Sequence, residues 1–348
     1  MHFGVFLEER RRGVGDGAAL QETLNLVEAS EAWGLDGVWL GEIHFNGSRS
    51  VQSAPVALAS FIAGRTRRVR IGTAVQVLPL SNPLRIAEEV ATVDQLSQGR
   101  FDFGIGRSGS PRAYDVLGVP YGESQARFLE SLEIIREAFK GRPFSYAGKF
   151  FRFENTAIAP APYQVPHPPM RMAANSPETF PQVAQLGLPL FVGLRDHDIP
   201  SLRVHLQAYR KAWRDSGQPG EADVFLRIPV YAAPTERAAT EEPREMITYF
   251  FERHTELVRG RLGRRDTGSA TRTQELAAKV AGMTYEEILE TRVAFGTAPR
   301  LVERLAQIRD ELGLTGVVAE LNPGGLLDMD RMRRTLRILT SEVMPALR

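Results

Sequence analysis

The sequence predicts an α/β fold, a (β/α)8 TIM barrel with insertions. Eight short β-rich runs alternate with longer segments whose apolar residues recur at helical spacing, and nearly every run is followed by such a segment. Eight such units with parallel strands favour a closed barrel, and an open doubly wound sheet is the second choice. No Gly-x-Gly-x-x-Gly follows the first run, which counts against the dinucleotide-binding version of the open sheet.

The strands are expected where apolar, β-branched and aromatic residues form short runs. They are Phe3–Leu7, Gly37–Leu40, Val69–Val77, Phe101–Ile105, Met170–Ala174, Leu190–Gly193, Phe225–Tyr231 and Gly316–Ala319.

The helices between these strands are expected from apolar spacing and from end signals. Leu20, Leu24 and Val27 share one face of the first helix, and Gly34 follows it as a C-terminal signal. The helices are Leu20–Trp33, Ala54–Ala63, Leu84–Leu96, Phe128–Phe139, Glu178–Leu186, Ser201–Trp213, Ala298–Leu312 and Arg331–Leu347.

Two stretches interrupt the alternation, and no linker divides the chain, so residues 1–348 are expected to form one domain. The first insertion, near 141–169, reads as a β-hairpin turning at Ala147-Gly148, followed by a proline-rich connector. The second, near 234–297, is charged and helical in pattern, without a clear strand. It is expected either to shape a substrate site or to form a lid with its own small core.

The composition excludes several classes of protein. The formal net charge of +1 gives no overall field toward nucleic acid, membrane or an acidic partner. The absence of cysteine removes disulfides, thiolate metal sites and cysteine nucleophiles. No apolar run is long enough to span a membrane and no signal peptide is visible, so a cytoplasmic protein is expected. Asp196-His197-Asp198 precedes Ile199-Pro200 and reads as a helix-entry loop, so no metal site is predicted.

The candidate acid–base residue is His44, within Glu42-Ile43-His44-Phe45. The segment follows a short buried run and opens into a polar loop. Barrels of this kind carry their chemistry at the C-terminal ends of their strands, and an imidazole there can exchange a proton near neutral pH. A single histidine is also compatible with a structural role.

A phosphate site is predicted from the ends of the fourth and fifth strands. Gly104-Ile105-Gly106 lets backbone approach a ligand closely, and Arg107 and Arg127 supply cations. Ser176 is expected to cap the fifth helix, with Pro177 at its first position, and a helix N-terminus favours anions. A plain turn and an ordinary cap are the alternatives. The small residues at Thr73–Val77 leave room for a flat ring.

Seven stretches of the chain, in order and with a gap across 232–292, resemble the bacterial luciferase-like flavin-dependent monooxygenases. They are Gly37–Phe45, Arg70–Ala74, Asp94–Phe101, Gly104–Arg107, Glu123–Phe128, Ala174–Ser176 and Asn322–Gly325. The chain departs from the family pattern at Ile43, where many relatives have a polar residue, and at Ser108, where glycine is common.

The resemblance implies a barrel that binds reduced FMN (FMNH2) at the strand C-termini. His44 would support a flavin C4a-(hydro)peroxide and its protonation states. Arg107, Arg127 and Ser176 would hold the FMN phosphate.

It further implies that Ala74 and Val75 lie under the isoalloxazine ring, often at a non-prolyl cis peptide, and that Ala174 and Asn175 belong to the cofactor site. Relatives usually form dimers through the second and third helices and receive reduced flavin from a separate reductase.

The function expected first is therefore a two-component FMN monooxygenase that uses O2 to oxidise a small organic substrate. A deazaflavin-dependent hydride-transfer enzyme is the second hypothesis. A catalytically silent flavin-binding partner subunit is the third.

Overall fold

The computed structural model describes residues 1–8, 10–108, 110–259, 274 and 277–348. Eight parallel strands form a closed barrel, in which β10 pairs with both β9 and β12 and so joins the two ends of the sheet. The barrel strands, in chain order, are β1 (His2–Leu7), β2 (Gly37–Leu40), β3 (Arg70–Thr73), β5 (Phe101–Gly106), β8 (Met170–Ala173), β9 (Leu190–Gly193), β10 (Val224–Ala232) and β12 (Gly316–Glu320). The short strand β4 (Gln76–Val77) continues β3 and pairs with β5.

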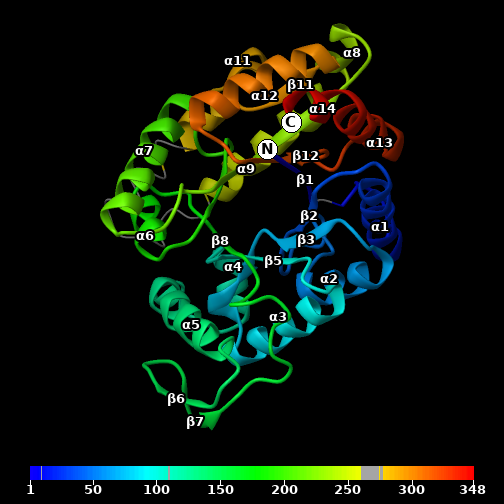
Figure 1. Ribbon diagram of the computed structural model, residues 1–348. Coiled ribbons are helices and arrows are strands. Elements are labelled where there is room, and N and C mark those ends of the chain that lie inside the picture. Colours follow the sequence, from blue (N-terminus) through cyan, green and yellow to red (C-terminus); the bar gives the residue numbers. More distant parts are fainter. Residues whose placement is uncertain (9, 109, 260–273, 275–276) are drawn as a thin grey trace.

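Helices surround the barrel, as Figure 1 shows. The covering helices are α1 (Asp16–Ala32), α2 (Pro55–Arg65), α3 (Pro83–Ser97), α5 (Ser124–Ala138), α6 (Thr179–Gln185), α7 (Ile199–Asp215), α12 (Ala298–Leu312), α13 (Met329–Ile338) and α14 (Met344–Leu347). Their ends follow local chemistry. Asn82 caps α3 by accepting a hydrogen bond from the Leu84 amide at 3.0 Å, and Gly313 ends α12 in the left-handed region at φ 60°.

The sequence located all eight barrel strands, and the closed barrel is confirmed over the open sheet. Three details were wrong. The region 234–297 does contain a strand, β11 (Ala294–Gly296), which pairs with β10. A short helix, α4 (Pro111–Val116), was missed. The last helix is interrupted by a π-helical turn at Leu339–Val343.

The inside of the barrel is filled by an aromatic cluster formed by Phe6, Trp39, Phe191 and Phe225. The Trp39 and Phe191 rings meet edge to face at 5.1 Å between centroids. Gly72 has no Cβ, which leaves space for the Trp39 ring: a Cβ there would collide with it. The barrel interior is therefore packed rather than open.

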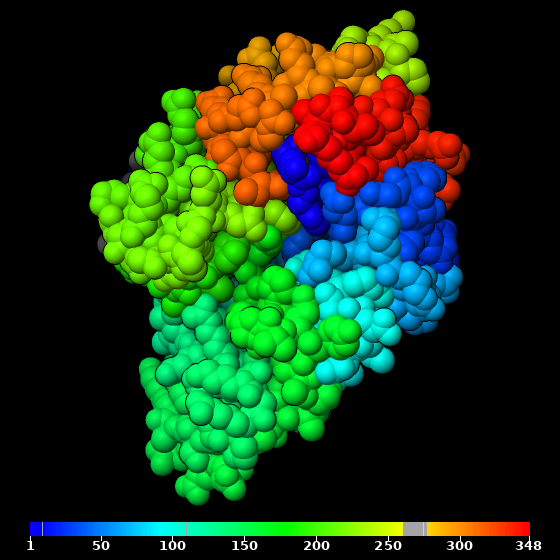
Figure 2. Space-filling view, viewed as in Figure 1, coloured from blue at the N-terminus to red at the C-terminus, as the bar shows by residue number. Residues whose placement is uncertain are grey.

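The predicted hairpin is formed by β6 (Phe144–Ala147) and β7 (Arg152–Thr156), which pair antiparallel. It projects from the barrel below α5 in Figure 1, and Figure 2 shows the same projection as the lower tip of the molecule. One carboxylate of α5 holds its turn: Glu130 accepts hydrogen bonds from the amides of Lys149, Phe150 and Phe151 at 3.1, 3.0 and 2.8 Å.

The second insertion contains α8 (Glu236–Glu241), α9 (Arg244–Arg259) and α11 (Tyr285–Thr291), together with β11. The parts of it at 260–273 and 275–276 lie outside the described residues. The buried face of α9, including Met246, Phe250 and Phe251, joins the main hydrophobic core instead of forming a separate one. At one end, the Met246 carbonyl lies so close to Gly324 that a Cβ there would collide. At the other, His254 bonds Asp196, just beyond β9. The helix therefore runs along the C-terminal ends of the strands.

Candidate active site

The imidazole of His44 is held by a carboxylate two residues before it. His44 Nε2 lies 2.6 Å from Glu42 Oε1, and the other carboxylate oxygen, Oε2, accepts the Val77 amide at 2.8 Å. The Glu42 side chain is buried, whereas that of His44 keeps 21 % of its surface exposed. The hydrogen bond to Glu42 raises the pKa of His44 above its usual value, against the lowering effect of partial burial. The arrangement therefore favours the protonated form of the imidazole.

Ala74 and Val75 lie between β3 and β4 and are joined by a non-prolyl cis peptide bond, as the family resemblance implied. Two glycines of β5 stand directly behind this segment. A Cβ on Gly104 would collide with the Thr73 carbonyl, and one on Gly106 would come 2.5 Å from the Val75 side chain. These glycines therefore make room for backbone and side chain of the neighbouring strand, which is a different use from the ligand approach expected from the sequence.

Gln76 follows this segment, and its Oε1 is buried without a donor among the described residues. Buried polar atoms are normally hydrogen-bonded, so an unmatched carbonyl beside Ala74-Val75 is an open acceptor for an N–H group of a ligand.

Arg107 and Arg127 come from different elements. Arg107 follows β5, and its carbonyl accepts a hydrogen bond from the buried Tyr114 hydroxyl. Arg127 lies in the first turn of α5, where Glu123 Oε2 accepts its Nε at 2.9 Å. The Arg127 guanidinium also stacks 4.3 Å from the centroid of the Phe150 ring, at the tip of the hairpin. The hairpin thus helps to orient a predicted phosphate-binding cation.

The segment Ala174-Asn175-Ser176 follows β8. Ala174 is buried and its amide donates to the Phe191 carbonyl at 3.1 Å. The Asn175 side chain donates to Asp196. Ser176 does not cap the helix as expected, because α6 begins at Thr179, one residue after the predicted start at Glu178 and two after Pro177. The Ser176 Oγ instead lies 2.8 Å from Thr179 Oγ1, which brings a second hydroxyl to the site.

The structure places the predicted residues other than Arg127 along one arc of the barrel mouth. They follow β2, β3, β5 and β8, which are consecutive neighbours in the sheet, whereas Arg127 lies in α5. Because parallel strands present their C-terminal ends on the same side, His44 and Arg107 share one end of the molecule. Asp196-His197-Asp198 is a helix-entry loop, as predicted: Asp198 caps α7 by accepting the Ser201 amide at 2.9 Å.

Sequence reasoning missed the residues that orient this arc. Glu123, Phe150 and Thr179 act through contacts between elements that no local pattern shows. For Thr179 a partial signal was present in the sequence, because its hydroxyl lies three residues after that of Ser176.

It also missed a buried charge cluster at the centre of the mouth, formed by Glu8, Arg49, Arg227, Glu320 and Arg195. Arg227 Nε donates to Glu320 Oε2 at 2.9 Å, and its guanidinium lies over the Phe6 ring at 3.6 Å from the centroid. Arg49 bonds Glu8. Acidic residues at the ends of β1 and β12 were the available signal.

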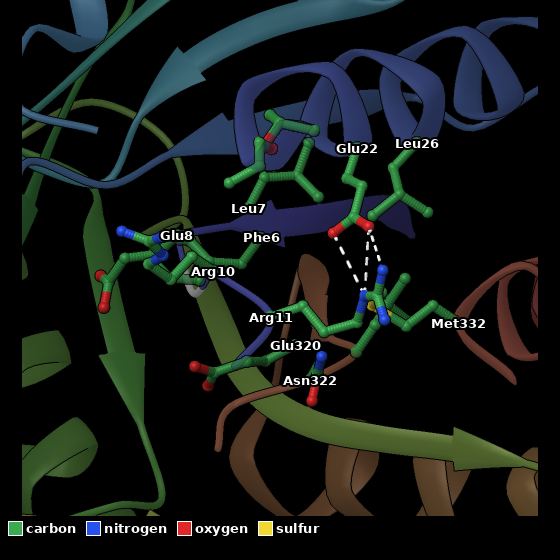
Figure 3. A pocket seen from close by; sticks show the side chains of 13 residues that line it. Phe6, Leu7, Glu8, Arg10, Arg11, Glu22, Leu26, Glu320, Asn322 and Met332 are labelled. Carbon is green, nitrogen blue, oxygen red and sulfur yellow. Dashed lines mark hydrogen bonds and ion pairs between the residues drawn. The ribbon is translucent and has the colours of Figure 1, made fainter. Parts of the chain in front are cut away.

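A pocket opens beside this cluster, between β1, β12, α1 and α13, and is shown in Figure 3. Glu8 and Glu320 line it together with Arg11, Glu22 and Asn322. Asn322 lies just after the last barrel strand, in the Asn322–Gly325 stretch that resembles the family. The lining includes neither His44 nor Arg107, so this pocket belongs to the opposite arc of the mouth.

Among the described residues, no group of three or more His, Asp and Glu side chains is arranged to hold a metal ion. Within the same residues, no helix combines the length and apolar character needed to cross a membrane.

Residues 1–316 match the family model of the luciferase-like monooxygenases, and the chain belongs to this family. Among its relatives is the oxygenase component of a flavin-dependent trigonelline monooxygenase from Acinetobacter baylyi, 26 % identical across 93 % of this chain and 89 % of that one. An uncharacterised protein of Sinorhizobium fredii is 36 % identical across 51 % of this chain, and there the match spans about half of the relative, 52 %.

Solved structures share the fold at low sequence identity. Monooxygenase RslO1 from Streptomyces bottropensis superposes with a TM-score of 0.84 at 23 % identity, covering 99 % of both chains. The oxygenating constituent of 3,6-diketocamphane monooxygenase from Pseudomonas putida, solved in complex with FMN, gives 0.82 at 18 %, covering 99 % of this chain and 98 % of that one. An F420-dependent secondary alcohol dehydrogenase gives 0.75 at 18 %, covering 100 % and 99 %.

Proposed function

We propose that this protein is the oxygenase component of a two-component flavin monooxygenase, which uses reduced FMN and O2 to oxidise a small organic substrate. The observation that carries the proposal is the Glu42–His44 pair, joined through the Val77 amide to the Ala74–Val75 segment. An acid–base group is thereby fixed beside the segment proposed to lie under the flavin ring.

The residues present fit FMN. Guanidinium groups and hydroxyls are the usual phosphate ligands in proteins, and Arg107, Arg127, Ser176 and Thr179 supply both kinds. The small Ala74, backed by the glycines of β5, leaves a face for a flat ring. The buried, unmatched Gln76 carbonyl offers an acceptor next to it. Ala174 and Asn175 would contribute backbone beside Ser176.

When bound, reduced FMN would supply the electrons that activate O2. The protein contributes the surroundings. His44 Nε2 is engaged by Glu42, and Nδ1 makes no hydrogen bond within the described residues, so Nδ1 is the atom proposed to exchange a proton with the reacting group. Helix α9, along the strand ends, would help to exclude water.

The proposed partners follow from this scheme. A separate reductase would supply reduced FMN. The chain would act as a homodimer through α2 and α3, and as one domain in the cytoplasm.

Stopped-flow spectroscopy tests the function. Protein loaded with reduced FMN is mixed with O2, and an oxygen adduct of the flavin is expected to form before oxidised FMN appears. His44→Ala should shorten the lifetime of that adduct, because the proton-exchanging group is gone, while FMN affinity stays within about twofold. His167→Ala is the matched control, since His167 bonds the Pro168 carbonyl at 2.8 Å, away from the arc. No adduct in any protein would contradict the proposal.

A deazaflavin-dependent hydride-transfer enzyme is the second candidate, favoured by the structural likeness to the F420-dependent dehydrogenase. Titration with FMN and with F420 separates the two, and tighter binding of F420 would reverse the order. The third candidate, a silent flavin-binding subunit, is contradicted by turnover of the purified protein with a generic flavin reductase.

A further inference from the structure

The charge cluster at the centre of the mouth is unevenly paired. Arg49 bonds Glu8, and Arg227 bonds Glu320 while lying 3.7 Å from Glu8. Both carboxylates are thus engaged by two of the three arginines. Arg195, the third, follows β9 and interacts electrostatically with Glu320 and Arg227 from across the mouth.

Arg195 lacks a bonded counter-charge among the described residues. Its Nε is shielded from solvent, and no described residue accepts a hydrogen bond from it. Its neighbour Asp196 is engaged elsewhere: one oxygen lies 2.5 Å from His254 Nε2, and the other accepts the Asn175 side chain. Burial lowers the pKa of Arg195, and although Asp196 raises it, Arg227 and Arg49 lower it further.

A guanidinium whose buried Nε–H has no acceptor carries a desolvation cost that no hydrogen bond offsets. Such a group is stabilised when an anion with two oxygens meets its planar fork. Arginine is also charged at all relevant pH values, so the site cannot relieve the imbalance by losing a proton.

We propose that Arg195 binds a carboxylate group of the substrate. This rests on the proposed function, and it adds a substrate class: small organic acids. Arg195, Arg227, Glu320 and Glu8 follow or lie on β9, β10, β12 and β1, and Arg49 lies in the loop after β2. The residues proposed for the FMN phosphate follow β5 and β8 and begin α5. The pocket of Figure 3 is lined by Glu8 and Glu320 of the same cluster, and Arg195 is not among its lining residues.

The test compares a charged probe with a neutral one of the same shape. Benzoate and benzamide are titrated by calorimetry into wild-type protein and Arg195→Met, each with and without FMN. Wild-type protein should bind benzoate in preference to benzamide, and Arg195→Met should weaken benzoate binding by at least about tenfold, as expected for a charged hydrogen bond. Benzamide binding should be unaltered.

Two variants complete the design. Arg195→Lys keeps the positive charge but loses the planar guanidinium that can bind two oxygens, so an intermediate benzoate affinity is expected. This variant replaces Arg195→Met in the test if the methionine variant unfolds. Arg203→Met is the matched control: this arginine of α7 is 51 % exposed and lies 3.6 Å from Glu311, on the outside of the barrel. It should bind benzoate as the wild type does.

FMN and riboflavin titrations of the same proteins test whether Arg195 binds the flavin phosphate instead, because riboflavin lacks that phosphate. Weakened binding of FMN alone in Arg195→Met, with riboflavin unaffected, would assign the arginine to the flavin phosphate and overturn the inference. Equal binding of benzoate and benzamide to wild type, or no binding of either, would overturn it as well. Benzoate binding through Arg195 in a protein that binds no flavin would support the anion site and contradict the proposed function.

Discussion

A single carboxylate fixes the imidazole at the strand ends. Glu42 uses one oxygen for His44 and the other for the Val77 amide, so the side chain is held from two sides. The sequence showed that an acid and an imidazole were near one another. It did not show the second bond, because Val77 is 35 residues away along the chain.

Glu42→Gln should lower the pKa of His44 toward its ordinary value of about 6.5, because a neutral amide replaces the carboxylate whose hydrogen bond and charge raise it. A raised folded-state pKa stabilises the protein below about pH 6.5, and this contribution disappears as the pH rises through the folded value. The variant should therefore lose more stability relative to wild type near about pH 6 than near about pH 9. NMR titration of the His44 ring and denaturant unfolding at both pH values measure this. An unchanged His44 titration would show that Glu42 does not control its proton.

Gly104 illustrates where sequence reasoning gives the right residue for a different reason. Its position at the end of a strand pointed to a close approach, and the structure shows one. The approaching group is the Thr73 carbonyl of the neighbouring strand. A glycine in the sequence indicates that another group must approach the backbone closely there. The pairing of the strands in the fold determines which group that is.

At the scale of elements, periodicity located the barrel strands but not every boundary. The eight strands are buried runs between turn signals, so they stand out. β11 has three residues, which is too short for a pattern, and it exists because β10 extends beyond the barrel and offers a partner. The helix α6 begins at Thr179, and Ser176 bonds the hydroxyl of that residue instead of capping the helix.

Glu130 of α5 is expected to determine the order of the hairpin tip, because its carboxylate collects the amides of 149–151. Glu130→Ala should lower the free energy of local opening at these amides by roughly 1–3 kcal/mol, which hydrogen exchange measures. Glu133→Gln is the control. It alters the 2.8 Å bond from the Tyr146 hydroxyl and leaves Glu130 in place, so protection at 149–151 should persist. Equal loss in both variants would show that the hairpin opens as a unit.

At the scale of the whole molecule, local patterns were enough to predict the barrel and half of its mouth. Residues directly after predicted strands, such as His44 and Arg107, were found because the fold itself assigns them to one end. The charge cluster was not, since Arg227 sits within a strand and meets Glu320 only through the pairing of β10 with β12, 93 residues apart in sequence.

The dimer expected from the family resemblance would use the outer surface of α2 and α3, which pack against each other and expose Phe61 and Leu96, 52 % and 58 % accessible. Sedimentation should give about twice the chain mass of 38.7 kDa. Phe61→Glu with Leu96→Glu should give the monomer, because two buried charges would face each other across a symmetric interface. Val204→Glu, on α7 and 58 % accessible, is the control and should remain dimeric. A monomeric wild type would contradict the proposed assembly.

Because β10 joins β9 to β12, the barrel strands within the described residues present no free row of amides and carbonyls to another molecule. In that part of the chain, the short strands β4 and β11 and the two strands of the hairpin each have a single partner. The barrel strands of two copies therefore cannot extend one another's sheet by main-chain hydrogen bonds at high concentration. A stable association between copies must depend on side-chain contacts.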